Sequence, residues 1–491
     1  MKTYQLSHPH FEDTSPYPPT NPNEVSTLST DLLSYENSLI KELKQNPTDL
    51  ISLGGLANFL TNFPDRRDEA IAKFSELTTR FFPQNEDKEL APHLKLPLSI
   101  YCTLFASLVE LQDKELANSL LLRALELDPS NPLSMGNYSS FLHKTMKNYK
   151  EAEKHYLQAL DTHPDHASIH VKYANFCKSI KRDNAVASKH FKTAVRLSPK
   201  NADVLSSYAV FLHANVNDIK SAEVFYQRAF EADRTHVNNL SNYGLFLSEM
   251  KGELKMAEKM YCLAMEVDPK HANSIYNYAV MLDSGYNDYS RAEPLYKRCI
   301  EVNPTHSFAL YNLAILVEEV RGVSGGEVSD ERSARATAQH ICLGSGLTIQ
   351  QADSFFKRAM EANQGDSVTV ADYGRFKLVT EKDLEEAEKL LKQSVEMDKN
   401  CVVGNYNYGQ LLFMKGKTDE AEKCFRCVLD VDSWHVEALR YLGKCFAGKD
   451  DKLAEKFFKK AIESLNGKKS GNQSSSTGKD LIQELNQLSK K

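Results

Sequence analysis

Apolar residues return at helical spacing along most of the chain. In the stretch HANSIYNYAVMLDSG, residues 271–285, they fall at i, i+3, i+4 and i+7, on one face of a helix. These residues are Ile275, Tyr278, Ala279 and Leu282. After a short polar turn, YSRAEPLYKRCIEVNP at 289–304 has the same pattern and ends in a proline, which stops a helix. The pattern predicts two amphipathic helices joined by a tight turn.

This two-helix pattern repeats with a period of 35 residues, and three columns of residues keep the period in phase. The first column is Tyr138, Tyr173, Tyr208, Tyr243 and Tyr278, continued by Leu313. The second is Ala152, Ala187, Ala222, Ala257 and Ala292. The third is Pro129, Pro164, Pro199, Pro269 and Pro304. Self-similarity at a fixed period of this length is the signature of a repeat architecture.

Small and large residues also recur in two facing columns. The small column is Ser139, Ala174, Ala209, Gly244, Ala279, Ala314, Gly374, Gly409 and Gly443. The large column is Tyr156, Phe191, Tyr226, Tyr261, Tyr296, Phe356, Leu391, Phe425 and Phe458. Small side chains opposite large ones let two helices approach closely at native packing density. We expect each pair to pack in this way.

The repeats resemble those of the tetratricopeptide repeat (TPR) family. The residues that carry the resemblance in one unit are Ile275, Tyr278, Ala279, Leu282, Ala292, Tyr296, Cys299 and Pro304. The resemblance implies an all-α, right-handed superhelical solenoid of stacked helix-turn-helix repeats that serves as a general interaction scaffold. The sequence departs from the family in its period of 35, which we assign to one extra residue between the two helices.

The repeats divide the chain into several expected segments. Residues 1–27 are expected to be a disordered N-terminus and 28–45 a capping helix, followed by a solenoid of about nine to eleven repeats over 46–465. Leu313 and Tyr373 are 60 residues apart, so a 25-residue insertion is expected near 320–347. A flexible linker over 466–479 and a short C-terminal helix or tail over 480–491 complete the chain. The insertion and the basic tail are either tolerated additions without a function or segments that regulate the protein or contact its partner.

Composition limits the cellular compartments and the classes of partner that we expect. The net charge of −6 argues against direct contact with nucleic acid, and no apolar run is long enough to span a membrane. The cysteines are scattered, as is usual for thiols that stay reduced, and the N-terminal residues have no signal-peptide core. We therefore expect a cytoplasmic protein, with the nucleus as an alternative.

Catalytic and metal-binding patterns are missing from the sequence. Cys424 and Cys427 form a CxxC, but it lies inside a second helix with no further ligand pair, which favours helix packing. Trp434 is expected to pack between repeats. The histidines that recur just before the first helices are expected to be capping residues, and they are His166, His236, His271, His306 and His435. We expect no catalytic residue, no metal and no cofactor.

The candidate binding site is a groove lined by the first helices of the repeats. A column of mainly asparagines lies one residue before the recurrent tyrosine, interrupted by Lys172, Ser207 and Asp372; its members are Asn137, Lys172, Ser207, Asn242, Asn277, Asn312, Asp372 and Asn407. Tyr276, Tyr311 and Tyr406 form the neighbouring column, and Asp283, Glu318 and Glu319 are expected to favour a basic or neutral ligand. An asparagine side chain can bond both the N–H and the C=O of an extended peptide. The alternative is that these asparagines bond neighbouring first helices.

The sequence therefore predicts a non-catalytic scaffold or adaptor that binds a partner protein or extended peptide of unknown identity. One alternative is a scaffold in RNA-processing machinery, because AEKHYLQAL and AEVFYQRAF also resemble half-a-tetratricopeptide repeats. A less favoured one is a TPR co-chaperone, for which only fragments of the carboxylate-binding pattern are present, such as Lys172 with Asn175.

Overall fold

The computed structural model describes residues 22–467 except 62, 64–65, 82–89 and 323–347. The expected insertion beyond residue 322, the expected linker beyond residue 467, the C-terminal tail and most of the expected N-terminal disorder lie outside the described residues. The chain forms two compact units, Met1–Ala232 and Asp233–Lys491, which we call the N-terminal and the C-terminal unit. The described residues are helical, with no strand among them.

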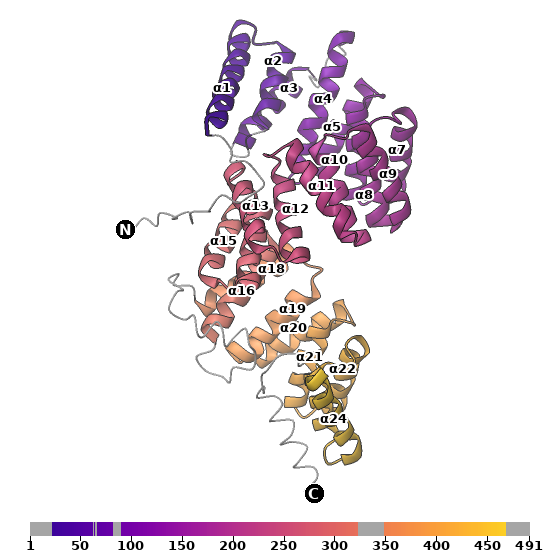
Figure 1. Ribbon diagram of the computed structural model, residues 1–491, viewed down its shortest axis with the longest axis vertical. Coiled ribbons are helices and arrows are strands. Elements are labelled where there is room, and N and C mark those ends of the chain that lie inside the picture. The colour runs from indigo at the N-terminus through magenta and orange to yellow at the C-terminus, as the bar shows by residue number, and fades with distance from the viewer. Residues whose placement is uncertain (1–21, 62, 64–65, 82–89, 323–347, 468–491) are drawn as a thin grey trace, which may run out of the picture. The chain divides into compact units, whose positions relative to one another are not determined.

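The N-terminal unit contains one single helix followed by consecutive helix pairs (Figure 1). The single helix is α1 (Pro22–Gln45), which begins six residues before the expected capping helix and packs on α2. The pairs are α2 (Leu50–Leu60) with α3 (Arg67–Phe81), α4 (Pro92–Val109) with α5 (Lys114–Leu127), α6 (Pro132–Lys144) with α7 (Tyr149–Thr162), α8 (Ala167–Phe176) with α9 (Asn184–Leu197), and α10 (Ala202–Phe211) with α11 (Ile219–Ala232).

The C-terminal unit is built from further pairs of the same kind. They are α12 (Val237–Phe246) with α13 (Leu254–Val267), α14 (Ala272–Val280) with α15 (Tyr289–Val302), α16 (Ser307–Gly322) with α18 (Ile349–Ala362), α19 (Ser367–Phe376) with α20 (Leu384–Met397), α21 (Val402–Met414) with α22 (Thr418–Val431), and α23 (Val436–Phe446) with α24 (Asp451–Gly467). In both units the first helices of neighbouring pairs also contact one another, as α12 and α14 do. The fold is thus the expected all-α solenoid of tetratricopeptide-type repeats.

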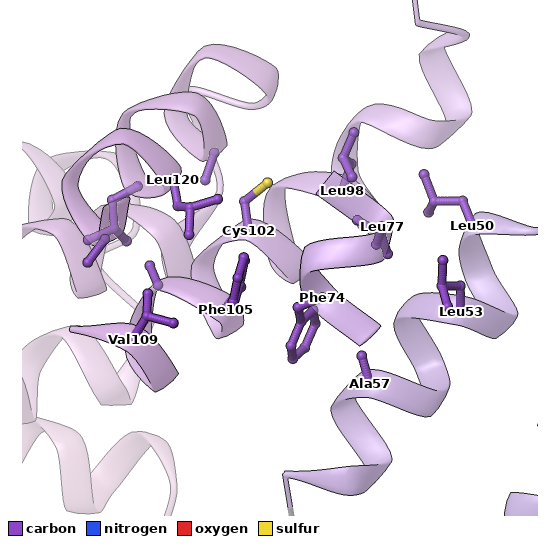
Figure 2. Packing of buried hydrophobic residues seen from close by; sticks show 14 of the residues in the cluster. Leu50, Leu53, Ala57, Phe74, Leu77, Leu98, Cys102, Phe105, Val109 and Leu120 are labelled. Atoms are coloured by element: carbon purple, nitrogen blue, oxygen red, sulfur yellow. The ribbon is translucent and has the colours of Figure 1, made fainter. Parts of the chain in front are cut away.

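The small and large columns pack as the sequence predicts. The facing large residue is fully buried in one pair after another, for example Tyr261, Tyr296 and Phe425. A β-carbon added to Gly244 would lie 2.8 Å from the ring of Tyr261, which shows how closely the two helices approach. The same logic extends to the first pairs of the chain, where the side chains of α2, α3, α4 and α5 form one continuous apolar cluster (Figure 2).

The extra residue of the 35-residue period lies within the first helix and not between the helices, which corrects our expectation. In five repeats the first helix ends in one wide π-turn, whose N–H groups reach back five residues. These turns are Cys177–Lys181, Leu212–Val216, Leu247–Lys251, Met281–Gly285 and Lys377–Glu381. Most are followed at once by a left-handed residue, such as Arg182 at φ 54° or Gly252 at φ 66°. A π-turn absorbs one added residue without breaking the helix pair.

Candidate functional site

The expected binding residues lie on the first helices of the repeats, some in the N-terminal unit and the others in the C-terminal unit. Asn137, Lys172 and Asn175 belong to α6 and α8 of the N-terminal unit. The remaining residues belong to α12, α14, α16 and α21 of the C-terminal unit, and they are Asn242, Tyr276, Asn277, Tyr311, Asn312, Tyr406 and Asn407. Because the repeat places equivalent residues on adjacent helices, neighbours in this row can bond one another.

Two asparagines of the row bond the preceding first helix. The Asn277 amide donates to the Ser241 hydroxyl at 3.3 Å. The Asn312 amide donates to the hydroxyl of Tyr276 on the first helix α14 and to that of Tyr296 on the second helix α15, each at 3.3 Å. Asn242 lies half-buried in the same row. These contacts agree with the alternative interpretation of the asparagine column, in which the asparagines bond neighbouring first helices. They hold successive first helices in register.

Asp283 does not line the surface, which corrects our expectation. Only 4% of its area is exposed, and it accepts a hydrogen bond from the buried Tyr296 hydroxyl at 3.0 Å. Burial, together with the adjacent Asp283 carboxylate, raises the pKa of Tyr296. Asp283 is therefore a partner inside the helix pair and is not available to a ligand.

Glu318, the equivalent residue of the next repeat, is also buried, with 5% of its area exposed. Both of its carboxylate oxygens accept from the Arg375 guanidinium, at 3.0 and 2.7 Å, and one also accepts from Thr380 at 3.2 Å. Burial raises the pKa of Glu318 even though Arg375 opposes the rise. This ion pair joins α16 to α19 on either side of the insertion, so Glu318 presents no free acid to a ligand.

Tyr311 also bonds between first helices. Its hydroxyl donates to Asp372 at 2.7 Å, and Asp372 in turn lies 3.4 Å from the Nε of Arg375. Burial, followed by the Asp372 charge, raises the pKa of Tyr311. Tyr311 is therefore held in a polar network that also contains the Glu318–Arg375 pair.

Tyr406 and Asn407, the last two expected residues, are more buried than residues that line a groove. Asn407 has only 3% of its area exposed. Tyr406 accepts a hydrogen bond from Gln410 at 2.7 Å, and Gln410 also donates to Tyr441 of the next first helix at 3.1 Å. The tyrosine ring packs between neighbouring aromatic side chains, including Tyr441 at 6.2 Å between centroids. This end of the row contributes mainly to packing.

In the N-terminal unit, the Lys172 ammonium donates to the Asn137 side-chain oxygen at 2.8 Å, across two first helices. Burial lowers the pKa of Lys172, which has a neutral amide as its hydrogen-bond partner. Asn175 lies half-buried one turn further along α8, and its carbonyl accepts from Ser179 at 2.7 Å. In the structure Lys172 therefore bonds Asn137. In the carboxylate-binding pattern of TPR co-chaperones, by contrast, Lys172 was expected to act together with Asn175.

Sequence reasoning missed one exposed aromatic residue, Phe308 near the start of α16. It has 55% of its area exposed, and its ring lies 6.2 Å from Tyr276 and 6.5 Å from His306. The preceding repeats have Asn238 and Asn273 at the equivalent position, 70 and 35 residues earlier. A phenylalanine in a column of polar residues is the signal that could have revealed it. We call Tyr276, His306 and Phe308 the aromatic patch.

The recurrent histidines are helix caps, as expected, in four of the five repeats. The Nδ1 atoms of His236, His271, His306 and His435 each accept the N–H three residues further on, at 3.0 to 3.3 Å. An acceptor Nδ1 requires an unprotonated nitrogen. His166, the fifth, caps α8 without such a bond.

The buried thiols are poor nucleophiles. Burial raises the pKa of Cys299 to about 12 and that of Cys424 to about 11, so both are protonated at neutral pH. Cys427, the other half of the CxxC, is exposed, so helix packing accounts for only one of the two. Within the described parts of the chain, no group of three metal-ligating side chains comes together. No helix in those parts is long and apolar enough to cross a membrane.

No family model and no curated protein matches this chain. Solved structures that it matches include the human IFIT1 dimer with m7Gppp-AAAA, at 14% identity over 89% of this chain and 95% of that one, with a TM-score of 0.46. The APC/C hetero-tetramer Cut9–Hcn1 matches at 14% identity over 95% and 88%, with a TM-score of 0.49. YrrB, a TPR protein with an unusual peptide-binding site, matches at 22% identity over 39% of this chain and 96% of its own, with a TM-score of 0.28. These likenesses concern the fold alone.

Proposed function

We propose that the protein is a non-catalytic scaffold that holds an extended segment of a partner protein on the first helices of its C-terminal unit. The observation that carries the proposal is the aromatic patch, in which the half-exposed Phe308 lies beside Tyr276. Exposed aromatic side chains bury a large area with little loss of conformational freedom, which is why they anchor protein interfaces.

The hydrogen bonds between first helices support this proposal in an indirect way. They fix Tyr276, Asn277 and Asn312 in defined positions before any partner arrives. Fixing side chains in advance reduces the entropy lost on binding. In this account the asparagines mainly position the surface, and the apolar contact with Phe308 provides most of the affinity.

The buried acids change the kind of ligand that we propose. Asp283 bonds Tyr296, and Glu318 is neutralised by Arg375. Two of the three carboxylates that we expected to favour a basic ligand therefore have partners inside the protein, and the side chain of the third, Glu319, lies outside the described residues. We propose that the segment bound at the aromatic patch is an apolar or aromatic one within an extended peptide, rather than a basic one.

The experiment that tests the proposal is affinity capture from native extract, followed by mass spectrometry, with wild-type protein and the Phe308→Asn variant. The variant reproduces the residue of the two preceding repeats, so the fold accommodates it. Losing the buried area of a phenylalanine costs about 1.5–3 kcal/mol, so we expect at least a roughly tenfold loss of the captured partner. Val267→Thr, which changes an exposed residue at the end of the second helix α13, is the matched control and should capture normally.

Capture of the same proteins in the same amounts by folded Phe308→Asn would overturn the proposal. Substituting Asn277 or Asn312 is a weaker test, because each variant also removes a hydrogen bond between repeats. Recovery of RNA-processing factors that depends on Phe308 would keep the scaffold role and assign it to that machinery. Turnover of a substrate by the purified chain would contradict the non-catalytic part of the proposal.

A further inference from the structure

A hollow of about 500 Å³ lies on the last described helix pair, and none of the first-helix residues discussed above lines it. One wall is the indole of Trp434, in the turn between α22 and α23, and the other is one face of α24. That face presents Lys452, Glu455, Lys456, Lys459, Lys460 and Glu463. The spacing of these residues puts them on a single side of the helix.

The turn that carries Trp434 does not need a tryptophan. The Trp434 N–H donates to the Asp432 side chain at 3.1 Å. The equivalent turns of earlier repeats form the same bond with a small or flexible polar residue, such as Thr235 to Asp233 at 2.8 Å and Asn400 to Asp398 at 2.9 Å. The indole is therefore an addition to a turn that is complete without it.

The position of Trp434 is nevertheless fixed. Its carbonyl accepts a hydrogen bond from Ser464 of α24 at 2.6 Å, so the backbone is held at both its N–H and its C=O. Half of the residue's area stays exposed, which differs from the inter-repeat packing role that we expected. The Lys460 ammonium lies 5.3 Å from the ring centroid and leaves part of the indole surface facing the hollow.

The hollow has an excess of positive charge, with four lysines against two glutamates in its lining. Lys459 is paired with Glu455 at 2.6 Å, and Lys460 lies over the indole. Within residues 348–467, no acidic side chain pairs with Lys452 or Lys456. Two ammonium groups beside an exposed aromatic ring suit an acidic ligand that also has an apolar group.

We propose that this hollow binds an acidic peptide segment of a partner protein, with an apolar side chain of the segment against Trp434 and its carboxylates near Lys452 and Lys456. The C-terminal residues 468–491 of the chain do not have the matching charge, because they contain five lysines and only two acids. Glu455 and Glu463 favour a peptide over nucleic acid, since their carboxylates can accept backbone N–H groups, which a sugar-phosphate backbone lacks. This second site does not depend on the first-helix function proposed above.

The chain offers a direct assay, because Trp434 is its single tryptophan. The full-length protein is titrated with the peptide Glu-Glu-Asp-Phe-Glu-Asp while its intrinsic fluorescence is recorded, and calorimetry measures the same binding without relying on the indole. We expect a saturable change that weakens as salt is added. Trp434→Thr should lose binding about tenfold or more by calorimetry, as expected when an aromatic anchor is removed.

A charge-reversal variant distinguishes binding of the peptide in the hollow from nonspecific electrostatic attraction to lysines elsewhere on the protein. Lys456→Glu should weaken binding about fivefold or more, whereas Lys392→Glu, a reversal on the second helix α20, should leave it unchanged. Absence of binding to the wild type, or equal binding by Trp434→Thr, would overturn the proposal. So would tighter binding of a single-stranded RNA hexamer than of the peptide. Phe308→Asn should retain the peptide, so failure here is distinguishable from failure of the first-helix function.

Discussion

The buried ion pair between Glu318 and Arg375 yields the sharpest prediction about stability. Arg375→Leu removes the two hydrogen bonds to Glu318, of 3.0 and 2.7 Å, and leaves that carboxylate with Thr380 alone. Breaking a buried pair from one side costs about 3–5 kcal/mol, because an uncompensated charge stays buried. Since 32% of the Arg375 side chain is exposed, we expect the lower end, about 3 kcal/mol.

The free energy of unfolding can be measured by urea titration, followed through the fluorescence of Trp434, which lies in the same unit. The double variant Glu318→Leu with Arg375→Leu should recover most of the loss, because the buried Glu318 charge is gone and Asp372 keeps its hydrogen bond from Tyr311. The cost of Arg375→Leu should also shrink with falling pH. Burial raises the pKa of Glu318, and protonation below that raised value removes the buried charge.

Three results would refute this reasoning. The first is a loss below about 1 kcal/mol for Arg375→Leu, which is the range of an exposed pair. The second is a double variant that is no more stable than the single one. The third is a cost that does not change as the pH is lowered.

Three further predictions concern the repeats themselves. Lys382→Gly should stabilise the protein by about 0.5–1 kcal/mol in urea titrations, because Lys382 has φ 57°, where Gly252 stands in another repeat. Acidification should remove about 1 kcal/mol for each of the caps His271 and His306, since burial lowers the pKa of both. That stability is present above about pH 6.5 and is lost as the pH falls through the lowered value; His271→Asn should flatten this part of the Tm profile. Gly443→Val should cost about 1–3 kcal/mol by thermal unfolding, because even a β-carbon would lie 2.6 Å from the Phe458 ring.

The fold could be predicted from sequence because its packing is local and periodic. Tyr296 and Ala279 face each other within one helix pair, so their spacing in the chain already encodes the contact. The position of the extra residue could not be predicted in this way. A residue added in a π-turn and one added in a loop leave the same spacing between columns, and only backbone hydrogen bonds such as that from the Arg182 N–H to the Cys177 carbonyl distinguish them.

The candidate site was predictable only in part, because the spacing identifies a row of residues but not their partners. Asn277 can donate to a ligand or to Ser241, and the choice depends on the distance between two helices. Asp283 looked exposed by its place in the row, but the Tyr296 hydroxyl draws it into the helix pair. Phe308 and Trp434 were detectable as exceptions to their columns, which is a different signal from periodicity.

The central claim is that a partner segment covers the aromatic patch. Hydroxyl-radical footprinting of the protein, free and saturated with its captured partner, measures this directly on Phe308 and Tyr276. We predict that oxidation of both side chains slows in the complex, while that of Leu384, exposed at the start of the second helix α20, does not change. Equal oxidation of Phe308 in the free and the saturated protein would contradict the account.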